Sequence, residues 1–195
     1  TERKQAEETA AKRATELELV ARVSAVTSTI LDVSELLQSV VDLTKDSFGL
    51  YHAHIYLLDE QAGVLNLTAG AGDVGRQMVA EGWQIPLERE TSLVARAART
   101  RQGVIANDVR EAPDYLPNPL LPDTRSELAV PMIVGDRVLG VLDVQSDTAD
   151  HFTDEDVQIQ TTLAGQIATA LQNADLFERT QVRLKVSQAL AGAQT

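Results

Sequence analysis

Histidine is scarce in this chain, and two of its three histidines stand close together. His52 and His54 are two residues apart in a segment that alternates like a β-strand, so both side chains should point to one face of a sheet. Two such histidines are candidate metal ligands, and His151 is the remaining histidine that could join them. The alternative is that they pack under a helix or face solvent. We favour that structural role, and we expect no metal and no other cofactor.

The chain has no cysteine, which excludes thiolate nucleophiles, thiol redox cycles and cysteine-ligated metals. Ser92 and Ser126 have no evident histidine partner, and the acidic run at residues 154–156 is better explained as a helix start than as general acids. The segment GAGDVG, residues 70–75, has the glycines of a phosphate-binding loop but lacks its lysine, so we expect a turn there. We therefore predict that this fragment is not an enzyme.

The formal net charge of −12 narrows the range of partners. A chain with this much negative charge repels the phosphate backbone of nucleic acids. We therefore do not expect nucleic acid as a partner. No apolar run approaches the ~20 residues that cross a bilayer, and no signal peptide opens the chain, so we expect no direct membrane insertion and a cytoplasmic location. The chain starts with Thr1 in helix-like sequence, which suggests a piece of a longer protein whose parent could be membrane-anchored.

The first 48 residues contain neither glycine nor proline and are rich in good helix formers. Within them, a 4-3-4 spacing typical of a coiled-coil seam is set by Leu19, Val23, Val26 and Ile30. This seam is consistent with a helix that packs on its own domain and equally with a parallel dimer. A second helix with one apolar side follows Asp32, and Gly49 is expected to end it.

The rest of the chain alternates short strands with helices. Strands are predicted on both sides of an EQAG turn (residues 60–63), at residues 104–109 and across the segment 126–146; a helix is predicted near residues 91–102. A last helix runs from Thr153 toward Ala191 without a proline, longer than a compact domain needs. Its 4-3 spaced apolar positions are Leu163, Ile167, Ala170, Ala174, Phe177 and Leu184. Its distal half should therefore project and pair with something.

Hairpin-linked strands between helices predict an α+β fold, an antiparallel sheet with helices stacked on it. Three segments, AHIYLLDEQAGVLNLTAGAG (53–72), SELAVPMIVGDRVLGVLDVQS (126–146) and FTDEDVQIQTTLAGQIATALQNADLFE (152–178), resemble the GAF domain, a sensor module of bacterial signalling proteins. The resemblance implies a GAF/PAS-like sheet of five or six strands. It places the terminal helices on one face and a pocket under a short helix and a variable loop on the other.

The resemblance also implies domain limits and partners. Residues 1–31 would be an N-terminal signalling helix, 32–178 the GAF domain and 179–195 a C-terminal helical extension. GAF domains are usually dimers joined through their terminal helices, and they commonly precede histidine kinases of two-component systems. We therefore expect a homodimer within a larger signalling protein, in contact with neighbouring domains of the same chain.

The resemblance places a ligand pocket between the sheet and the variable loop. Its implied apolar lining is Ile85, Leu87, Leu93, Val94, Ala97, Ile105, Leu116, Leu120, Leu121, Leu128 and Val130, with Trp83 beside it. Its implied polar residues are Arg96, Asn107, Tyr115, Arg125 and Glu127. Two functions stay open here, a pocket that binds a small molecule and a ligand-free module that dimerises and spaces its neighbours.

Some ligands and activities of GAF domains fit this chain poorly. Members that bind cyclic nucleotides carry a Lys and a Phe, which residues 107–130 lack, although Asn107 matches their Asn. Members that attach bilins, and the methionine sulfoxide reductases of the family, need a cysteine.

The segment APDYLPNPLLPDTRSELAVP (112–131) holds five of the chain's six prolines, and four of them fall in its first eleven residues, with leucines among them. Proline fixes φ and restricts the residue before it, so this loop should be stiff. We predict that it forms a lid whose leucines face the sheet.

Overall fold

The computed structural model describes residues 2–29 and 32–192, with the backbone alone for parts of the first and last helices. The elements, in chain order, are α1 (Glu2–Thr29), α2 (Val33–Phe48), β1 (His52–Asp59), β2 (Val64–Gly70), α3 (Gly72–Ala80), β3 (Gln84–Pro86), α4 (Leu93–Thr100), β4 (Val104–Ala106), β5 (Ser126–Val134), β6 (Arg137–Ser146) and α5 (Asp154–Gly192). The fold class is α+β, as the strand and helix patterns predict.

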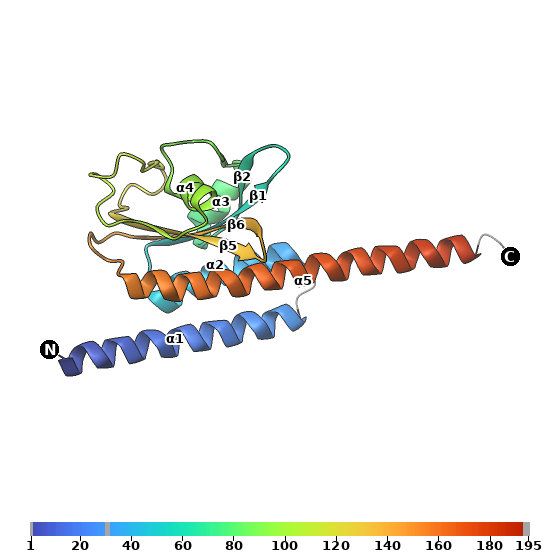
Figure 1. Ribbon diagram of the computed structural model, residues 1–195, viewed down its shortest axis with the longest axis horizontal. Helices are drawn as coiled ribbons and strands as arrows, with labels where there is room; N and C mark the ends of the chain where they lie inside the picture. Colours follow the sequence, from blue (N-terminus) through green and yellow to red (C-terminus); the bar gives the residue numbers. More distant parts are fainter. Residues whose placement is uncertain (1, 30–31, 193–195) are drawn as a thin grey trace.

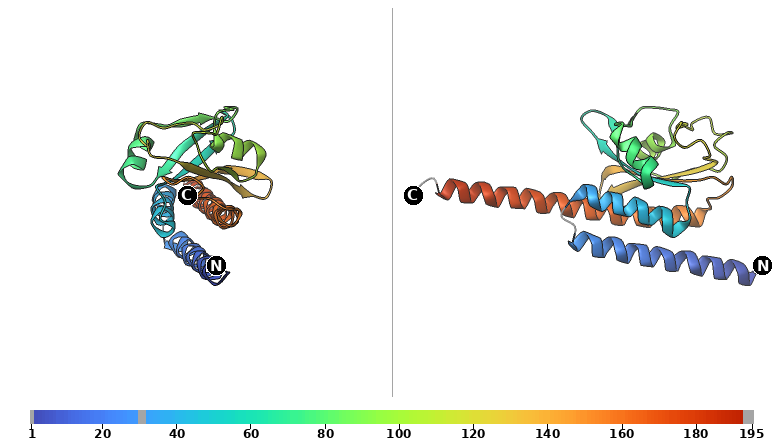
Figure 2. Two further views of the ribbon diagram at one scale, coloured as in Figure 1. Left: turned by 90° about the vertical axis from the view of Figure 1, so that its left-hand side faces the viewer. Right: turned by 180° about the vertical axis from the view of Figure 1, so that it is seen from behind.

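The strands form one six-stranded antiparallel sheet in the order β3-β2-β1-β6-β5-β4. The helices α2 and α5 lie side by side on one face of the sheet, and α1 lies outside them, as Figures 1 and 2 show. The other face carries α3, α4 and the lid loop, residues 107–125. A sheet that is covered on both faces builds two apolar clusters, one toward the helices and one toward the lid.

Local signals set the ends of the helices. The Asp32 carboxylate accepts hydrogen bonds from the backbone N–H groups of Ser34 and Glu35 at the start of α2. Gly49 ends α2 with a φ of 61°, a left-handed conformation that glycine adopts without steric cost. At the start of α5, Asp156 Oδ2 accepts the Thr153 N–H, and Thr153 Oγ1 accepts the Asp156 N–H, so two otherwise unpaired donors are satisfied.

The turn expected for residues 70–75 is wrong, because α3 begins at Gly72. The glycines there permit close packing instead. A Cβ on Gly75 would lie 2.0 Å from the carbonyl carbon of Gly70, and a Cβ on Gly70 would lie 2.6 Å from Gly75 Cα. These glycines therefore let the first turn of α3 fold back against the end of β2.

The long helix α5 divides into two parts. Its first part packs on the sheet, and the buried residues Leu163, Ile167 and Ala170 belong to the core of this domain. Beyond Leu171 the helix leaves the domain and projects into solvent (Figure 1). At about 1.5 Å per residue, its 39 residues span about 58 Å.

Part of the predicted seam is therefore buried inside the domain. Leu19 of α1 is also buried in the core, so at this position α1 packs on its own domain. Ala174 is half-buried. The side chains of Val23, Val26, Phe177 and Leu184, together with Ile30, lie outside the described residues. Within the residues that are described, no helix has both the length and the apolar character needed to cross a bilayer.

Candidate functional site

Three neighbouring strands bring polar side chains together beneath the lid. His54 and Tyr56 come from β1, Asp143 and Gln145 from β6, and Glu127 from β5. The register places His54 opposite Asp143 and Glu127 opposite Gln145, so they share one face of the sheet. All five side chains are buried. This polar cluster forms the floor of a small cavity, here named the lid pocket.

The floor of the lid pocket is hydrogen-bonded, but incompletely. Asp143 Oδ2 lies 3.1 Å from His54 Nδ1 and accepts a 2.9 Å hydrogen bond from Gln145 Nε2. Gln145 Oε1 in turn accepts a 2.8 Å hydrogen bond from the Thr124 hydroxyl. His54 Nε2 is buried without a hydrogen-bond partner, and Asp143 Oδ1 has none among the N–H donors and hydroxyl groups around it. The carboxyl of Glu127, when it carries a proton, is the group that donates to Asp143. Such unpaired buried atoms are costly, so they mark a place where a further polar group would be stabilised.

Burial shifts the proton affinity of several groups in and near the floor. Burial first, and then the negative charge of Asp143, raise the pKa of Glu127 well above its usual value, so this carboxyl favours its protonated form. Burial likewise raises the pKa of Tyr56 and lowers that of His52, behind the floor, to about 3. Perturbed groups gathered in one cavity are typical of functional sites.

The roof of the lid pocket comes from α3, β3, α4 and the lid loop. Ser92 and Val94 belong to the start of α4, where the Ser92 hydroxyl accepts the Ala95 N–H at 3.1 Å and caps the helix. The other roof residues are Met78, Trp83, Ile85, Leu116, Asn118 and Leu121. The cavity between roof and floor measures about 20 Å³. That is room for about one water molecule, so a larger ligand requires the roof to move.

Several of the residues predicted for the pocket do line it. They are Trp83, Ile85, Val94, Leu116, Leu121 and Glu127. Others pack in the same apolar cluster around the lid pocket without lining the cavity, namely Leu87, Leu93, Ala97, Tyr115 and Leu120. The prediction that leucines of the proline-rich segment face the sheet is confirmed, because Leu121 is buried and Leu116 and Leu120 pack against this cluster.

Three predicted lining residues lie on the wrong face of the sheet. Leu128 and Val130 of β5 point toward α5 and are buried in the helix-side core, and Ile105 of β4 packs against that core as well. Side chains alternate along a strand, so Glu127 facing the lid requires Leu128 to face the helices. The apolar character of these residues reports burial but not the face on which they are buried.

The other predicted polar residues anchor the lid loop. Arg96 forms an exposed ion pair with Asp114 at 2.7 Å, and Arg125 pairs with Asp108 at 3.1 Å. Asn107 forms two hydrogen bonds with the backbone of Phe152, from its Nδ2 to the carbonyl at 3.0 Å and from the Phe152 N–H to its Oδ1 at 3.2 Å. These contacts hold the two ends of the lid.

The floor residues His54, Tyr56, Asp143 and Gln145 were not predicted as pocket residues. A signal was present, because polar side chains occupy alternate positions of otherwise apolar strands. Such residues mark a polar site on one face. Among residues 2–29 and 32–192, no group of three or more His, Cys, Asp or Glu side chains lies close enough together to hold a metal ion. The rings of the two histidines of β1 lie 4.3 Å apart, and His54 faces Asp143.

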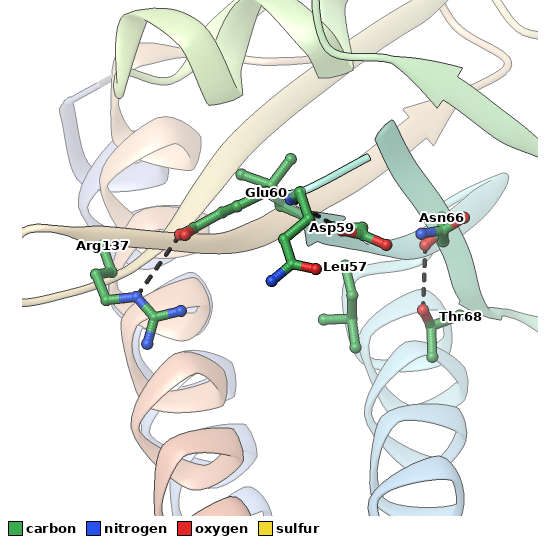
Figure 3. Close-up of a pocket in the computed structure, with 8 residues that line it drawn as sticks. Leu57, Asp59, Glu60, Asn66, Thr68 and Arg137 are labelled. Carbon is green, nitrogen blue, oxygen red and sulfur yellow. Dashed lines mark hydrogen bonds and ion pairs between the residues drawn. The ribbon is translucent and has the colours of Figure 1, made fainter. Parts of the chain in front are cut away.

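A second hollow lies on the surface beside the β1–β2 hairpin (Figure 3). It measures about 560 Å³ and is open to solvent. Its polar groups have local partners. Asp59 caps the hairpin turn by accepting the N–H groups of Gln61 and Ala62, and Glu60 pairs with Arg137 at 3.6 Å. The hollow is thus explained by the hairpin geometry, and the lid pocket remains the better candidate.

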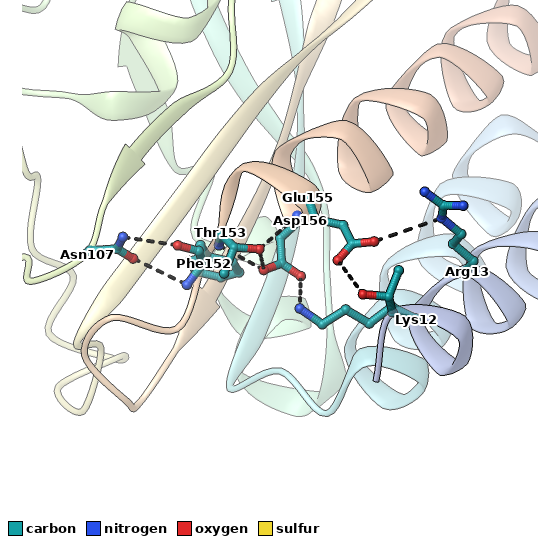
Figure 4. A network of polar contacts seen from close by, with 8 residues as sticks. Lys12, Arg13, Asn107, Phe152, Thr153, Glu155 and Asp156 are labelled. Carbon is teal, nitrogen blue, oxygen red and sulfur yellow. Dashed lines mark hydrogen bonds and ion pairs between the residues drawn. The ribbon is translucent and has the colours of Figure 1, made fainter. Parts of the chain in front are cut away.

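A polar network connects the lid loop to the outer helix α1 (Figure 4). From Asn107 it passes through Phe152 to the capped start of α5. There Asp156 pairs with Lys12 of α1 at 2.8 Å, and Glu155 lies 3.9 Å from Arg13. Burial tends to raise the pKa of Asp156, but its hydrogen bonds, with Lys12 foremost, lower it overall. The network joins the lid, α5 and α1 through adjacent contacts.

Comparisons with solved structures show the same fold in several bacterial proteins. The GAF domain of a phosphoenolpyruvate-protein phosphotransferase from Coxiella burnetii is 18% identical, with a TM-score of 0.74 over 85% of this chain and 98% of that one. A GAF sensor protein from Burkholderia vietnamiensis is 23% identical, with a TM-score of 0.72 over 84% and 98%. The free methionine-R-sulfoxide reductase of Neisseria meningitidis, solved with its substrate, is 23% identical, with a TM-score of 0.71 over 83% and 90%.

No curated protein matches the chain. The model of the GAF domain family, in contrast, matches residues 30–172, which span the sheet, the lid and the first part of α5. The match covers most of the sequence. The chain therefore belongs to the GAF domain family.

Proposed function

We propose that this chain is a regulatory GAF domain that binds a small molecule in the lid pocket and acts within a larger cytoplasmic signalling protein, such as a histidine kinase. The observation that carries the proposal is the incompletely paired polar floor. Buried polar atoms at Asp143 and His54 that lack a fixed partner lower the stability of the folded domain. A ligand with polar groups would offset that cost, whereas a purely structural domain gains nothing from it. Ligand pockets combine such convergent polar groups with an apolar lining.

The proposed role is binding without catalysis. The structural relatives include a reductase, but this chain has no cysteine to supply a redox thiol. The floor carboxyl groups of Glu127 and Asp143 disfavour a phosphate, so a cyclic nucleotide is a poor fit.

The network of Figure 4 offers a route from the pocket to the helices. A ligand that moves the lid would change the position of Asn107, which holds Phe152 immediately before α5. A shift there would change the contact of Asp156 with Lys12 and hence the docking of α1. We propose this route as the way in which occupancy of the pocket reaches neighbouring domains.

We propose that the domain acts as a homodimer, in which the change caused by a bound ligand is passed to the next domain. The projecting half of α5 exposes Val182 and Val186, one helical turn apart, with exposed fractions of 56% and 53%. Apolar side chains on one side of a projecting helix are stabilised when a second copy covers them. The dimer would then transmit changes at the start of α5 along that helix.

A ligand-free spacer is the second candidate, and the small volume of the lid pocket favours it. Native mass spectrometry of the chain purified from cells separates the two functions. A bound small molecule, or a thermal shift on adding compounds from a metabolite panel, supports the regulatory function. A protein without bound species that responds to no compound of the panel is a spacer.

A further inference from the structure

Two carboxyl groups share the floor of the lid pocket with little positive charge to balance them. Glu127 and Asp143 are 4% and 1% exposed and belong to the paired strands β5 and β6. Among the described residues that line the cavity, none is a lysine or an arginine. Two negative charges in such a site are costly. The pair is more stable when the two carboxyl groups share a proton, or when a cation lies between two ionised carboxylates.

The surrounding elements do not supply that cation. From β1, Tyr56 is neutral and His54 contacts Asp143 through Nδ1. The lid contributes a further negative charge at Asp114, which Arg96 of α4 pairs on its exposed side. On the other flank Arg125 is paired with Asp108, and Tyr115 carries a pKa raised to about 12, chiefly by burial. Among the described residues that line the floor, the acidic groups Glu127 and Asp143 thus face one basic side chain, His54, which contacts Asp143.

We propose that the lid pocket binds a small organic cation, a primary ammonium group on a short apolar chain, which replaces a proton held by Glu127 and Asp143. This inference rests on the proposed ligand-binding function. An ammonium group donates three hydrogen bonds, and once the shared proton leaves, Glu127 and Asp143 offer carboxylate oxygens to accept them, since Asp143 Oδ1 has no other partner. The roof complements the rest of such a ligand, because Trp83 offers an aromatic ring to the cation and Ile85 and Leu121 offer apolar contacts to the chain.

A divalent metal ion fits the site less well than an organic cation. Metal binding needs several converging ligands, and no group of three histidine or carboxylate ligands is found within the described part of the chain. The Nδ1 atom of His54 is also already engaged with Asp143. An ammonium ion, in contrast, requires only hydrogen-bond acceptors.

The exchange couples binding to pH. Burial and the neighbouring Asp143 raise the pKa of Glu127, so its carboxyl favours the protonated form in the free protein and releases the proton when the cation binds. Affinity for the cation should then increase with pH, by at most about tenfold per pH unit for one released proton, until Glu127 is ionised in the free protein.

The test uses the chain of residues 1–195 and the emission of Trp83, its only tryptophan, which lies in the roof. The protein is titrated with methyl-, ethyl-, propyl- and butylammonium chloride at several pH values between about 6 and 8. Sodium chloride, the matched alcohols and the matched carboxylates are the controls. We expect saturable changes with an ammonium compound alone, with affinity that rises with pH. Glu127→Gln should weaken binding by about tenfold or more and remove the pH dependence, whereas the exposed Glu88→Gln should not.

The outcomes separate this inference from the function on which it rests. If an alcohol or a carboxylate binds as well as its ammonium counterpart, the proposal of a cationic ligand is wrong, but the ligand-binding function of the lid pocket stands. If an ammonium compound binds equally to Glu127→Gln, the proposed position of the charge is wrong. If no compound of any class binds, the cation proposal fails, and the ligand panel of native mass spectrometry decides the pocket function separately.

Discussion

At the scale of single residues, each central strand contributes side chains both to the lid pocket and to the helix-side core. In β5 the side chain of Glu127 faces the lid, and the next residue, Leu128, faces the helices. The same alternation in β1 places His54 in the lid pocket and Ile55 in the helix-side core. Polar groups can therefore be buried in the middle of the domain without interrupting the apolar core on the other face.

Glu127 should make the stability of the domain depend on pH. A carboxyl whose pKa is raised on folding contributes most below its unfolded pKa of about 4.5, and that stability is lost as pH rises toward the folded value. Urea unfolding of the wild-type chain should thus show a contribution from this group that falls as pH rises above about 4.5, with a slope of at most about 1.4 kcal/mol per pH unit. Glu127→Gln should reduce that slope and unfold at higher urea concentration at about pH 8. The same slope in Glu127→Gln and in the control Glu88→Gln would contradict this account.

At the scale of elements, close steric packing and polar contacts position the helices and the lid, in addition to apolar contacts. The start of α3 approaches β2 so closely that neither Gly70 nor Gly75 has room for a Cβ. The lid loop is tied at its base by Asn107 and Arg125, and Leu121 inserts beneath it. These features position the roof over the polar floor.

Gly75→Ala should displace α3, because the new methyl group would overlap the backbone of Gly70. We expect a loss of about 1–3 kcal/mol in the free energy of unfolding, measured by urea denaturation. Gly165→Ala is the matched control, since a Cβ at that position of α5 meets nothing within 4 Å. There alanine should stabilise the helix by about 0.5–1 kcal/mol. Equal effects of the two substitutions would argue against close packing as the reason for Gly75.

The lid can be tested with two neighbouring leucines. Leu121 is 4% exposed and lines the lid pocket, whereas Leu120 is only half-buried. Leu121→Ala should lower the free energy of unfolding by about 2–4 kcal/mol, and Leu120→Ala should cost clearly less. Thermal and urea unfolding both measure the difference. If Leu121→Ala left stability unchanged, the lid would not be closed over the sheet in solution.

At the scale of the whole molecule, α5 belongs to the domain and also extends beyond it. Among the side chains of α5 that the structure describes, Leu171 is the last buried one, and Val182 and Val186 are exposed on the projecting part. The domain therefore needs only the first part of α5 for its core. The second part is available for another copy of the chain or for the next domain.

Removing residues 176–195 should leave the fold intact and abolish the proposed dimer. Sedimentation velocity should show a dimer for residues 1–195 and a monomer for residues 1–175, with similar urea midpoints for the folded domain. Val182→Lys combined with Val186→Lys should also weaken the dimer, because both charges would be buried in it. Arg183→Ala, on the same helix, serves as the control. A monomeric chain 1–195, or a dimeric chain 1–175, would rule out the proposed role of distal α5.

The sequence by itself determined the elements that depend on local chemistry. The Asp32 and Gly49 signals mark α2, the Thr153–Asp156 pair marks the start of α5, and the alternation of apolar residues marks the strands. The α+β fold and the presence of a leucine-bearing lid followed from the same patterns and from the family resemblance. These features are readable because each depends on residues that are near one another in the chain.

Only the tertiary structure decided which face each buried side chain occupies. Leu128 is apolar and buried like Leu121, and Ile105 is apolar and partly buried, yet both lie on the opposite side of the sheet from Leu121. Likewise, His54 and Asp143 are far apart in sequence and become partners only through the β1–β6 register. Local propensity does not encode such pairing, because strand register and the choice of face are fixed by the packing of the whole sheet between its two covering layers.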